Sequence, residues 1–179
     1  MKFNPWHDAS IGEESPEIVE AIIEIPQNSK AKYEMDETTG MLRLDRVLFS
    51  SMRYPVNYGF IPQTYGEDFD PLDVVVLSQI DIRPMCLVSA KVIGVLRMID
   101  DGEPDDKIIA VAKDDMSVNH INSVEELSDH YKEELINFFE DYKKLERKTV
   151  EVSGIEGKEA AFKIIKDSIV AYDEKFKKK

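Results

Sequence analysis

The sequence predicts a single α+β domain, because strand-like segments occupy its first two thirds and helical periodicity appears only in its last third. The chain has 179 residues, of which 42% are hydrophobic and 33% charged, and this balance is typical of one folded domain. No internal repeat and no low-complexity linker divides it. We therefore expect one domain over residues 1–179.

The predicted strands are short apolar runs, many of them rich in β-branched residues and bounded by turn signals. Residues 18–25 end at Pro26, and residues 32–36 and 41–44 flank a turn at residues 37–40 that predicts a hairpin. Further strands are expected at residues 73–77, 87–99, 107–112 and 148–152.

Two helices are expected after most of the strands. Ser123 and Glu126 form a capping-box pattern, which predicts that the first helix begins there. Apolar residues then recur at helical spacing: Leu127, Tyr131, Leu135, Phe138, Phe139, Tyr142 and Leu145. The second helix is predicted from about Lys158. Its apolar stripe consists of Ala161, Ile165, Ile169, Tyr172 and Phe176.

The charge and the cysteine content restrict partners and location. A formal net charge of −13 would repel nucleic acid, and would also repel a small anion unless metal ions or a local basic cluster reversed the field. The single cysteine, Cys86, is typical of a cytoplasmic protein, and its apolar neighbours predict a buried, inert thiol. No signal-peptide core or membrane-spanning apolar run is present, so we expect neither secretion nor a membrane partner.

The strongest chemical signal is the hexapeptide at residues 68–73, Asp-Phe-Asp-Pro-Leu-Asp, which an apolar run follows directly. In extended backbone Asp68 and Asp70 share a face, and Pro71 can turn Asp73 back beside them. Three such carboxylates repel one another unless a cation lies between them, and Mg²⁺ prefers oxygen ligands. By itself, the hexapeptide is equally well explained as a solvated acidic turn before a strand.

Two known acidic motifs fit this hexapeptide poorly. An EF-hand calcium loop needs a glycine and a terminal glutamate that are absent here. In a haloacid-dehalogenase-type phosphatase the apolar strand precedes the Asp-x-Asp pair, whereas here it follows.

A second acidic segment spans residues 100–106, where Gly102 and Pro104 predict a loop, and it ends at Lys107. Alone it is better explained as a solvated loop, but beside the first cluster it is a candidate wall of a multi-metal site. A third group is basic and aromatic, and such side chains can hold phosphate oxygens. Its members are Lys32, Arg46, Tyr54, Tyr58, Tyr142 and Lys143. Taken singly, the cations are also explained as surface charge and the tyrosines as half-buried core, and for Tyr142, on the apolar stripe of the first helix, core packing is the better explanation.

In combination and in this order, these groups resemble family I soluble inorganic pyrophosphatases. The resemblance extends from about Asn4 to Tyr172, and its signature is the Asp-x-Asp-Pro-x-Asp motif at 68–73. Supporting motifs are Ile-Glu24-Ile-Pro, Lys32-Tyr-Glu34, Leu-Asp-Arg46, Tyr54-Pro-x-Asn-Tyr58-Gly, the loop ending in Lys107 and Phe-Phe-Glu-Asp-Tyr142-Lys143. The chain departs from the family at Phe69, where a small residue such as glycine is usual, and at Asp101, where bacterial relatives often carry Glu.

The resemblance implies a compact five-stranded, OB-like β-barrel with flanking α-helices, in a cytoplasmic homo-oligomer for which a hexamer is favoured. It also implies hydrolysis of inorganic diphosphate to two phosphates with several Mg²⁺ ions per active site, for which Mn²⁺ or Zn²⁺ are substitutes. Asp70 is then the general base. The implied metal ligands are Asp68, Asp73, Asp100, Asp105 and Glu34. The implied substrate-binding residues are Lys32, Arg46, Tyr58, Lys107, Tyr142 and Lys143, supported by Glu24 and Tyr54.

The competing interpretation from another class of protein is a non-enzymatic OB-like module that binds nucleic acid or polyphosphate. Such modules use a basic groove with stacking aromatic side chains. Here the net charge has the opposite sign and the candidate site is lined by carboxylates. The sequence therefore favours the enzyme.

Overall fold

The computed structural model describes residues 3–177, and within them β1 to β8 precede the first long helix while β9 lies between the two long helices, in agreement with the predicted late strand. The strands are β1 (Ile18–Ile25), β2 (Ala31–Met35), β3 (Leu42–Val47), β4 (Asn57–Phe60), β5 (Asp73–Leu77), β6 (Cys86–Asp100), β7 (Glu103–Pro104), β8 (Lys107–Ala112) and β9 (Val150–Gly157). The helices are α1 (Pro5–Asp8), α2 (Asp129–Asp141) and α3 (Lys158–Tyr172), with short helical turns η1 (Val124–Glu126), η2 (Lys144–Glu146) and η3 (Asp173–Lys177).

Five of the strands close into a ring. The order is β1–β4–β5–β8–β6, and β6 pairs again with β1. The pairing of β5 with β8 is parallel, and the other four pairings of the ring are antiparallel. The prediction of an α+β fold built on a five-stranded barrel is therefore confirmed. Because β6 has 15 residues, it also pairs with β7 and β9 beyond the ring.

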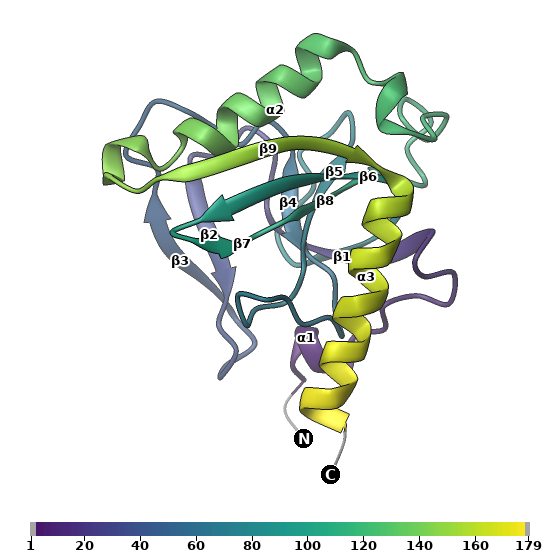
Figure 1. The fold of residues 1–179 in the computed structure, drawn as a ribbon. Coiled ribbons are helices and arrows are strands. Elements are labelled where there is room, and N and C mark those ends of the chain that lie inside the picture. Colours follow the sequence, from purple (N-terminus) through teal and green to yellow (C-terminus); the bar gives the residue numbers. More distant parts are fainter. Residues whose placement is uncertain (1–2, 178–179) are drawn as a thin grey trace.

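The two long helices cover different parts of this sheet. Leu135 and Phe138 of α2 pack into one apolar core, and Ala161 and Ile165 of α3 pack into another. Figure 1 shows β9 arching beneath α2, while α3 runs along one side of the barrel toward α1. Because both faces of β8 are covered, all six of its residues are buried. Burial of each such aliphatic side chain contributes about 1.5–3 kcal/mol.

The first long helix begins later than the capping-box pattern predicted. Ser123 precedes only η1 and makes no side-chain cap, and Leu127 then returns to an extended conformation. The helix α2 begins at Asp129, because the hydroxyl oxygen of Ser128 accepts a hydrogen bond of 3.1 Å from the Tyr131 N–H. Two cap residues therefore lie close together in the chain, and only the second has a continuous helix after it.

Cys86 is exposed, so the prediction of a buried thiol was wrong. It begins β6 at an end of the barrel, and its neighbours Met85 and Leu87 are also exposed. An apolar stretch is buried only when another element covers it, and none of the described residues covers this end of the strand.

The predicted hairpin at residues 37–40 is confirmed, since β2 and β3 pair on either side of it. The carboxylate of Asp36 accepts hydrogen bonds from the Thr39 N–H and hydroxyl, both 2.7 Å long. Gly40 has a positive φ of 67°, a conformation that glycine adopts without strain. Among residues 3–177, no helix is long and apolar enough to cross a membrane.

Candidate active site

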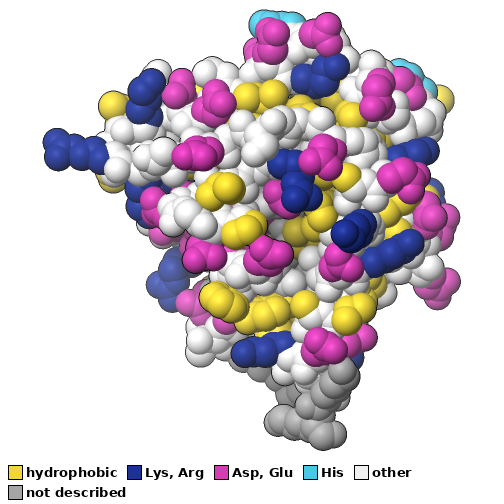
Figure 2. Space-filling view, viewed as in Figure 1, with side chains coloured by type: hydrophobic (Ala, Val, Ile, Leu, Met, Phe, Trp, Pro, Cys, Tyr) yellow, Lys and Arg dark blue, Asp and Glu magenta, His cyan; other side chains and the backbone are white. Residues whose placement is uncertain are grey.

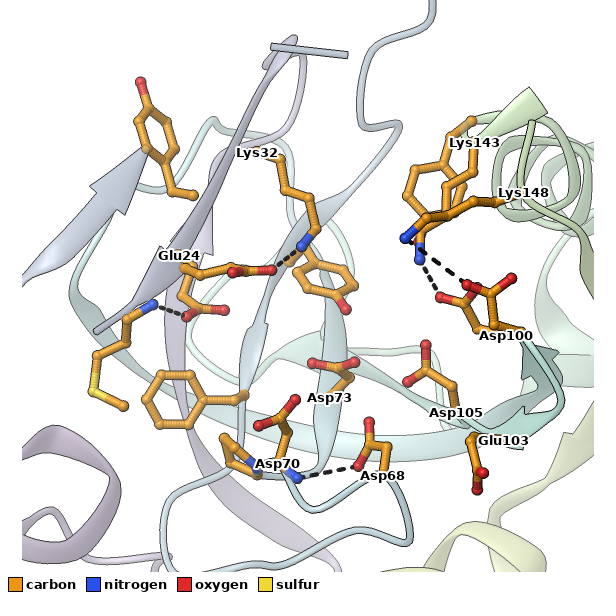
Figure 3. A pocket seen from close by; sticks show the side chains of 18 of the residues that line it. Glu24, Lys32, Asp68, Asp70, Asp73, Asp100, Glu103, Asp105, Lys143 and Lys148 are labelled. Atoms are coloured by element: carbon orange, nitrogen blue, oxygen red, sulfur yellow. Dashed lines mark hydrogen bonds and ion pairs between the residues drawn. The ribbon is translucent and has the colours of Figure 1, made fainter. Parts of the chain in front are cut away.

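A cavity of about 450 Å³ lies beside the barrel, between β2, β4, the loop that leads into β5, and the β6–β7 hairpin. Figure 3 shows the carboxylates of Asp68, Asp70, Asp73 and Asp105 around one space, with Lys32 on one side and Lys143 on the other. The predicted site residues that line the cavity are Glu24, Lys32, Glu34, Tyr58, Asp68, Asp70, Asp73, Asp100, Asp105, Tyr142 and Lys143.

Three predicted residues lie just behind this lining. Lys107 is buried and its ammonium donates to Asp73, at 2.6 Å, and to Asp105. Tyr54 is also buried, and its ring packs edge-on against Tyr58. These residues support the wall of the cavity.

Arg46 is the third residue behind the lining. Its guanidinium donates from Nε to Glu146 at 2.8 Å and from Nη1 to Asp45, while its Nη2 is buried without a hydrogen-bond partner among the described residues. A buried guanidinium nitrogen with donors to spare is suited to an anionic oxygen.

Asp68 and Asp70 reach the cavity by a turn and not by the extended backbone that the sequence analysis assumed. The Gly66 N–H donates to the Asp70 carbonyl at 2.8 Å, and the Phe69 N–H donates to the Gly66 carbonyl at 3.2 Å. Phe69 has a φ of 74°, which costs roughly 1–2 kcal/mol for a residue with a β-carbon. Its side chain is 70% exposed and packs on Tyr65, 6.2 Å between ring centroids, outside the cavity lining.

Burial and the crowding of carboxylates raise the pKa values of Asp68 and Asp70. Burial, together with the negative charges of Asp73 and Asp105, raises the pKa of Asp68 to about 7. Burial and the charge of Asp73 raise the pKa of Asp70 to about 6. At neutral pH this group therefore holds protons that isolated aspartates would have lost, unless positive charge is supplied.

Lys107 pairs with two buried carboxylates, Asp73 and Asp105, whose pKa values shift in opposite directions. Burial raises the pKa of Asp73 although the ammonium opposes the shift, whereas for Asp105 the ammonium outweighs burial and lowers the pKa. The pKa of Lys107 is itself raised, because the attraction of both carboxylates outweighs burial. This lysine therefore stays charged at neutral pH.

Glu24 lies on β1 at the edge of the same cavity. Burial raises its pKa to about 8, even though its carboxylate accepts a hydrogen bond of 2.6 Å from the Met35 N–H. Tyr58 is kept protonated, because burial and the charge of Asp73 raise its pKa well above the usual value. Both groups can therefore present protons to the cavity at neutral pH.

Cations flank the acidic centre on two sides. Lys32 pairs with Glu34, and Lys143 pairs with Asp100. The sequence analysis missed Lys148, whose ammonium lies 3.8 Å from Asp101. It also missed Glu37 and Glu103, which line the cavity as well. Nothing in the local sequence distinguishes these three from surface charges. The β2–β3 hairpin brings Glu37 to the site, the β6–β7 hairpin brings Glu103, and the segment before β9 brings Lys148.

The donor set fits a hard cation such as Mg²⁺. Among residues 3–177, no three aspartate, glutamate, histidine or cysteine side chains converge closely enough to form a ready-made metal cage. However, the Oδ1 atom of Asp100 is buried without a hydrogen-bond partner in the same part of the chain. Oxygen atoms of this kind, among carboxylates with raised pKa values, are the ligands that Mg²⁺ prefers. The arrangement can bind cations and, through them and the flanking lysines, a phosphate-rich anion.

The comparisons with known proteins match one family. The family model described as Inorganic pyrophosphatase matches residues 21–173. Soluble inorganic pyrophosphatase 2 of Chlamydomonas reinhardtii is 49% identical over 173 residues, which cover 97% of this chain and 90% of that protein. Soluble inorganic pyrophosphatase 4 of Arabidopsis thaliana is 49% identical over 169 residues, covering 94% and 78%. The crystal structure of an inorganic pyrophosphatase from Thermus thermophilus aligns with a TM-score of 0.93 and 38% identity, over 96% of this chain and 99% of that one.

Proposed function

This chain belongs to the soluble inorganic pyrophosphatase family and hydrolyses inorganic diphosphate to two phosphates, and we propose that the acidic cavity beside β5 is its active site. The observation that supports this assignment is the gathering of carboxylates with raised pKa values between two groups of cations. Such perturbed, clustered groups in a cavity are typical of catalytic sites.

The family is generally Mg²⁺-dependent, and we assign the metal ligands to carboxylates of the cavity. The proposed ligands are Asp68, Asp73, Asp100, Asp105 and Glu34. When bound, Mg²⁺ supplies positive charge that neutralises the substrate and lowers the pKa of water. The acidic chain thus binds an anion although its net charge is −13.

Asp70 is the proposed general base. A water oxygen attacks one phosphorus, the bond from that phosphorus to the bridging oxygen breaks, and the other phosphate leaves with that oxygen. The proton of the attacking water passes to the Asp70 carboxylate. With a pKa raised to about 6, Asp70 is mostly ionised at neutral pH, yet it accepts a proton more readily than an ordinary aspartate.

The cationic and hydroxyl groups hold the phosphates in line for this attack. The proposed contacts are Lys32, Arg46, Tyr58, Lys107, Tyr142 and Lys143. The unpartnered Nη2 of Arg46 and the protonated hydroxyl of Tyr58 support direct donation to phosphate oxygens. Lys107 supports the site mainly by pairing with both Asp73 and Asp105 and offsetting their mutual repulsion. Glu24 and Tyr54 are supporting residues.

A non-enzymatic module that binds nucleic acid or polyphosphate gains no support from the surface in view. Figure 2 shows Lys and Arg side chains interspersed with Asp and Glu and not gathered into a basic groove. Electrostatic attraction to a phosphate backbone requires such a groove.

The test of the proposed site is a phosphate-release assay with diphosphate. Activity should require Mg²⁺, disappear in excess EDTA and return when Mg²⁺ is added, with Mn²⁺ and Zn²⁺ as partial replacements. Substitution of the proposed ligands should raise the Mg²⁺ concentration needed for half-maximal rate. Full activity after exhaustive metal removal would overturn the metal assignment.

We further propose one domain over residues 1–179, a cytoplasmic location and a homo-oligomer, with a hexamer favoured. The unpaired, exposed Cys86 supports a reducing compartment. The exposed side chains of Ile80, Leu87 and Met116 around a cavity of about 660 Å³ support a contact with a second copy of the chain. Light scattering after size-exclusion chromatography measures the subunit number, and a monomer at all concentrations would contradict the oligomer.

A further inference from the structure

We infer that Thr64 is a positioning residue for catalysis, because its side chain closes the loop that carries the acidic motif. This inference rests on the proposed roles of Asp68, Asp70 and Asp73. Thr64 itself is outside the cavity lining, so it can act only through those carboxylates.

The hydroxyl of Thr64 joins the two ends of the loop. It donates a hydrogen bond of 2.6 Å to the Ile61 carbonyl and accepts one of 2.9 Å from the Leu72 N–H. The Ile61 N–H in turn donates to the Leu72 carbonyl at 2.9 Å. Because Thr64 is 0% exposed, water cannot replace either bond of its hydroxyl. Leu72 directly precedes Asp73, so this junction determines where β5 begins.

Thr64 and its two neighbours are also held from outside the loop, by hydrogen bonds to α1 and to α3. The indole N–H of Trp6, a residue that is 2% exposed, donates to the Thr64 carbonyl at 2.8 Å. The Gln63 N–H donates to the Trp6 carbonyl at 2.9 Å, and the Tyr65 N–H donates to the Ser168 carbonyl of α3 at 3.0 Å. Residues 63–65 are therefore held between α1 and α3, and Figure 1 shows these two helices near each other.

The segment beyond this anchor is held much less firmly. The hydrogen bonds within this segment are the two backbone bonds of its turn and a side-chain bond of 3.3 Å, which the Asp70 N–H donates to the Asp68 carboxylate. A β-carbon at Gly66 would come within 2.6 Å of that carboxylate, so the turn passes close to Asp68 only because residue 66 has no side chain. Because few bonds hold the turn itself, its position depends on the closure at Thr64.

Thr64→Val tests the hydroxyl with almost no change of shape. A displacement of about 1 Å at a reacting centre costs up to roughly 10²-fold in rate, so we expect kcat to fall by about 10- to 100-fold. The KM for diphosphate should change by only a few-fold, because the lysines and Arg46 are untouched. Calorimetry should show weaker Mg²⁺ binding, and amide exchange at Leu72 should become faster. Thr64→Ser restores a donor and an acceptor, and should recover most of kcat.

Ser78→Ala is the matched control at the other end of β5. It removes a hydroxyl that donates to Asp115 at 2.7 Å, and should leave kcat and Mg²⁺ affinity unchanged. If Thr64→Val does not fold, Trp6→Phe keeps an aromatic ring at this buried position but removes the indole N–H that bonds the Thr64 carbonyl, and should lower kcat less, in the same direction. Circular dichroism and melting temperature establish that each variant is folded.

The outcomes separate this inference from the proposed function. A folded Thr64→Val enzyme with unchanged kcat and Mg²⁺ affinity overturns the positioning role, as does a Thr64→Ser enzyme no better than Thr64→Val. Unchanged kinetics in a folded Trp6→Phe enzyme, where Thr64→Val fails to fold, overturns it as well. By contrast, full activity of Asp70→Asn overturns the proposed role of Asp70 as general base, whatever Thr64 does.

Discussion

The strand β5 has a cluster of carboxylates before its first residue and a single carboxylate, Asp115, near its other end, and the surroundings of the two differ. After the strand, Asp115 accepts hydrogen bonds from the Ser78 hydroxyl at 2.7 Å, the Gln79 N–H at 2.8 Å and the Ser117 hydroxyl at 2.6 Å. The Ser117 hydroxyl and these other donors hold the pKa of Asp115 well below its usual range.

Before the strand the pKa shifts have the opposite sign. The pKa values of Asp68 and Asp70 are raised by burial and by neighbouring negative charges. A carboxylate surrounded by donors stabilises the turn that it closes, whereas carboxylates crowded together cost stability and are available to a cation. Acidic composition alone therefore does not identify a site, whereas the surroundings of the carboxylates distinguish the two ends of β5.

The largest expected effect is that of Asp70→Asn. If Asp70 takes the proton from the attacking water, turnover should fall by roughly 10²–10⁴, the usual contribution of a general base. Fold, most Mg²⁺ binding and diphosphate binding should persist. Steady-state kinetics over a Mg²⁺ titration measures turnover and diphosphate binding, and calorimetry measures metal binding. Circular dichroism checks the fold.

Asp73→Asn should have a different signature. It removes a buried proposed ligand that also pairs with Lys107, so Mg²⁺ affinity and turnover should fall together. Added Mg²⁺ should recover part of the lost rate. If high Mg²⁺ restored Asp70→Asn and not Asp73→Asn, the two roles would have to be exchanged.

The two ends of β5 should also respond oppositely to pH in EDTA. Because the folded-state pKa of Asp68 is raised to about 7, its ionisation destabilises the fold as pH rises from about 4 through 7. Asp68→Asn should therefore raise the melting temperature at pH 8 and change little at pH 4. For Asp115 the folded-state pKa is lowered, so its stabilising effect is present above about pH 4 and is lost as pH falls further.

Asp115→Asn should accordingly lower the melting temperature by a few degrees at pH 8 and much less at pH 2. Its kcat and Mg²⁺ requirement at 25 °C should equal those of the parent protein. Thermal melts across this pH range measure both variants, and shifts of the same sign at pH 8 would contradict the comparison.

The smallest effects are expected at Phe69. Phe69→Gly relieves a left-handed backbone conformation but removes a ring that is mostly exposed, so the two changes should nearly cancel. Phe69→Ala loses the ring and keeps the strain, so it should be the less stable of the two. Kinetics should remain within a few-fold, with any loss appearing in Mg²⁺ affinity. Loss of turnover without a change in Mg²⁺ affinity or melting temperature would instead place Phe69 at the reacting centre.

Local features of the sequence were sufficient for several parts of the molecule. The apolar runs predicted β5 and β8, the helical stripe predicted α3 from Lys158, and the hairpin turn at 37–40 was confirmed. These features depend on side-chain periodicity and on turn residues, which act over a few positions. The resemblance to the family then predicted the barrel, and it named the acidic, basic and aromatic residues that the structure brings together in or beside one cavity.

Other properties depend on contacts between distant segments. The start of α2 at Ser128, the exposure of Cys86 and the presence of Lys148 at the site follow from which elements pack together. The tertiary structure also decided that Asp68 and Asp70 meet through a turn with Phe69 in a left-handed conformation. Thr64 looks ordinary in the sequence, and it acquires its proposed role only because Trp6, Ser168 and Leu72 converge on its segment. Residues that are close in the chain determine periodicity. Burial and hydrogen-bond partners are determined by the closed barrel and by the helices α1 and α3 that pack near it.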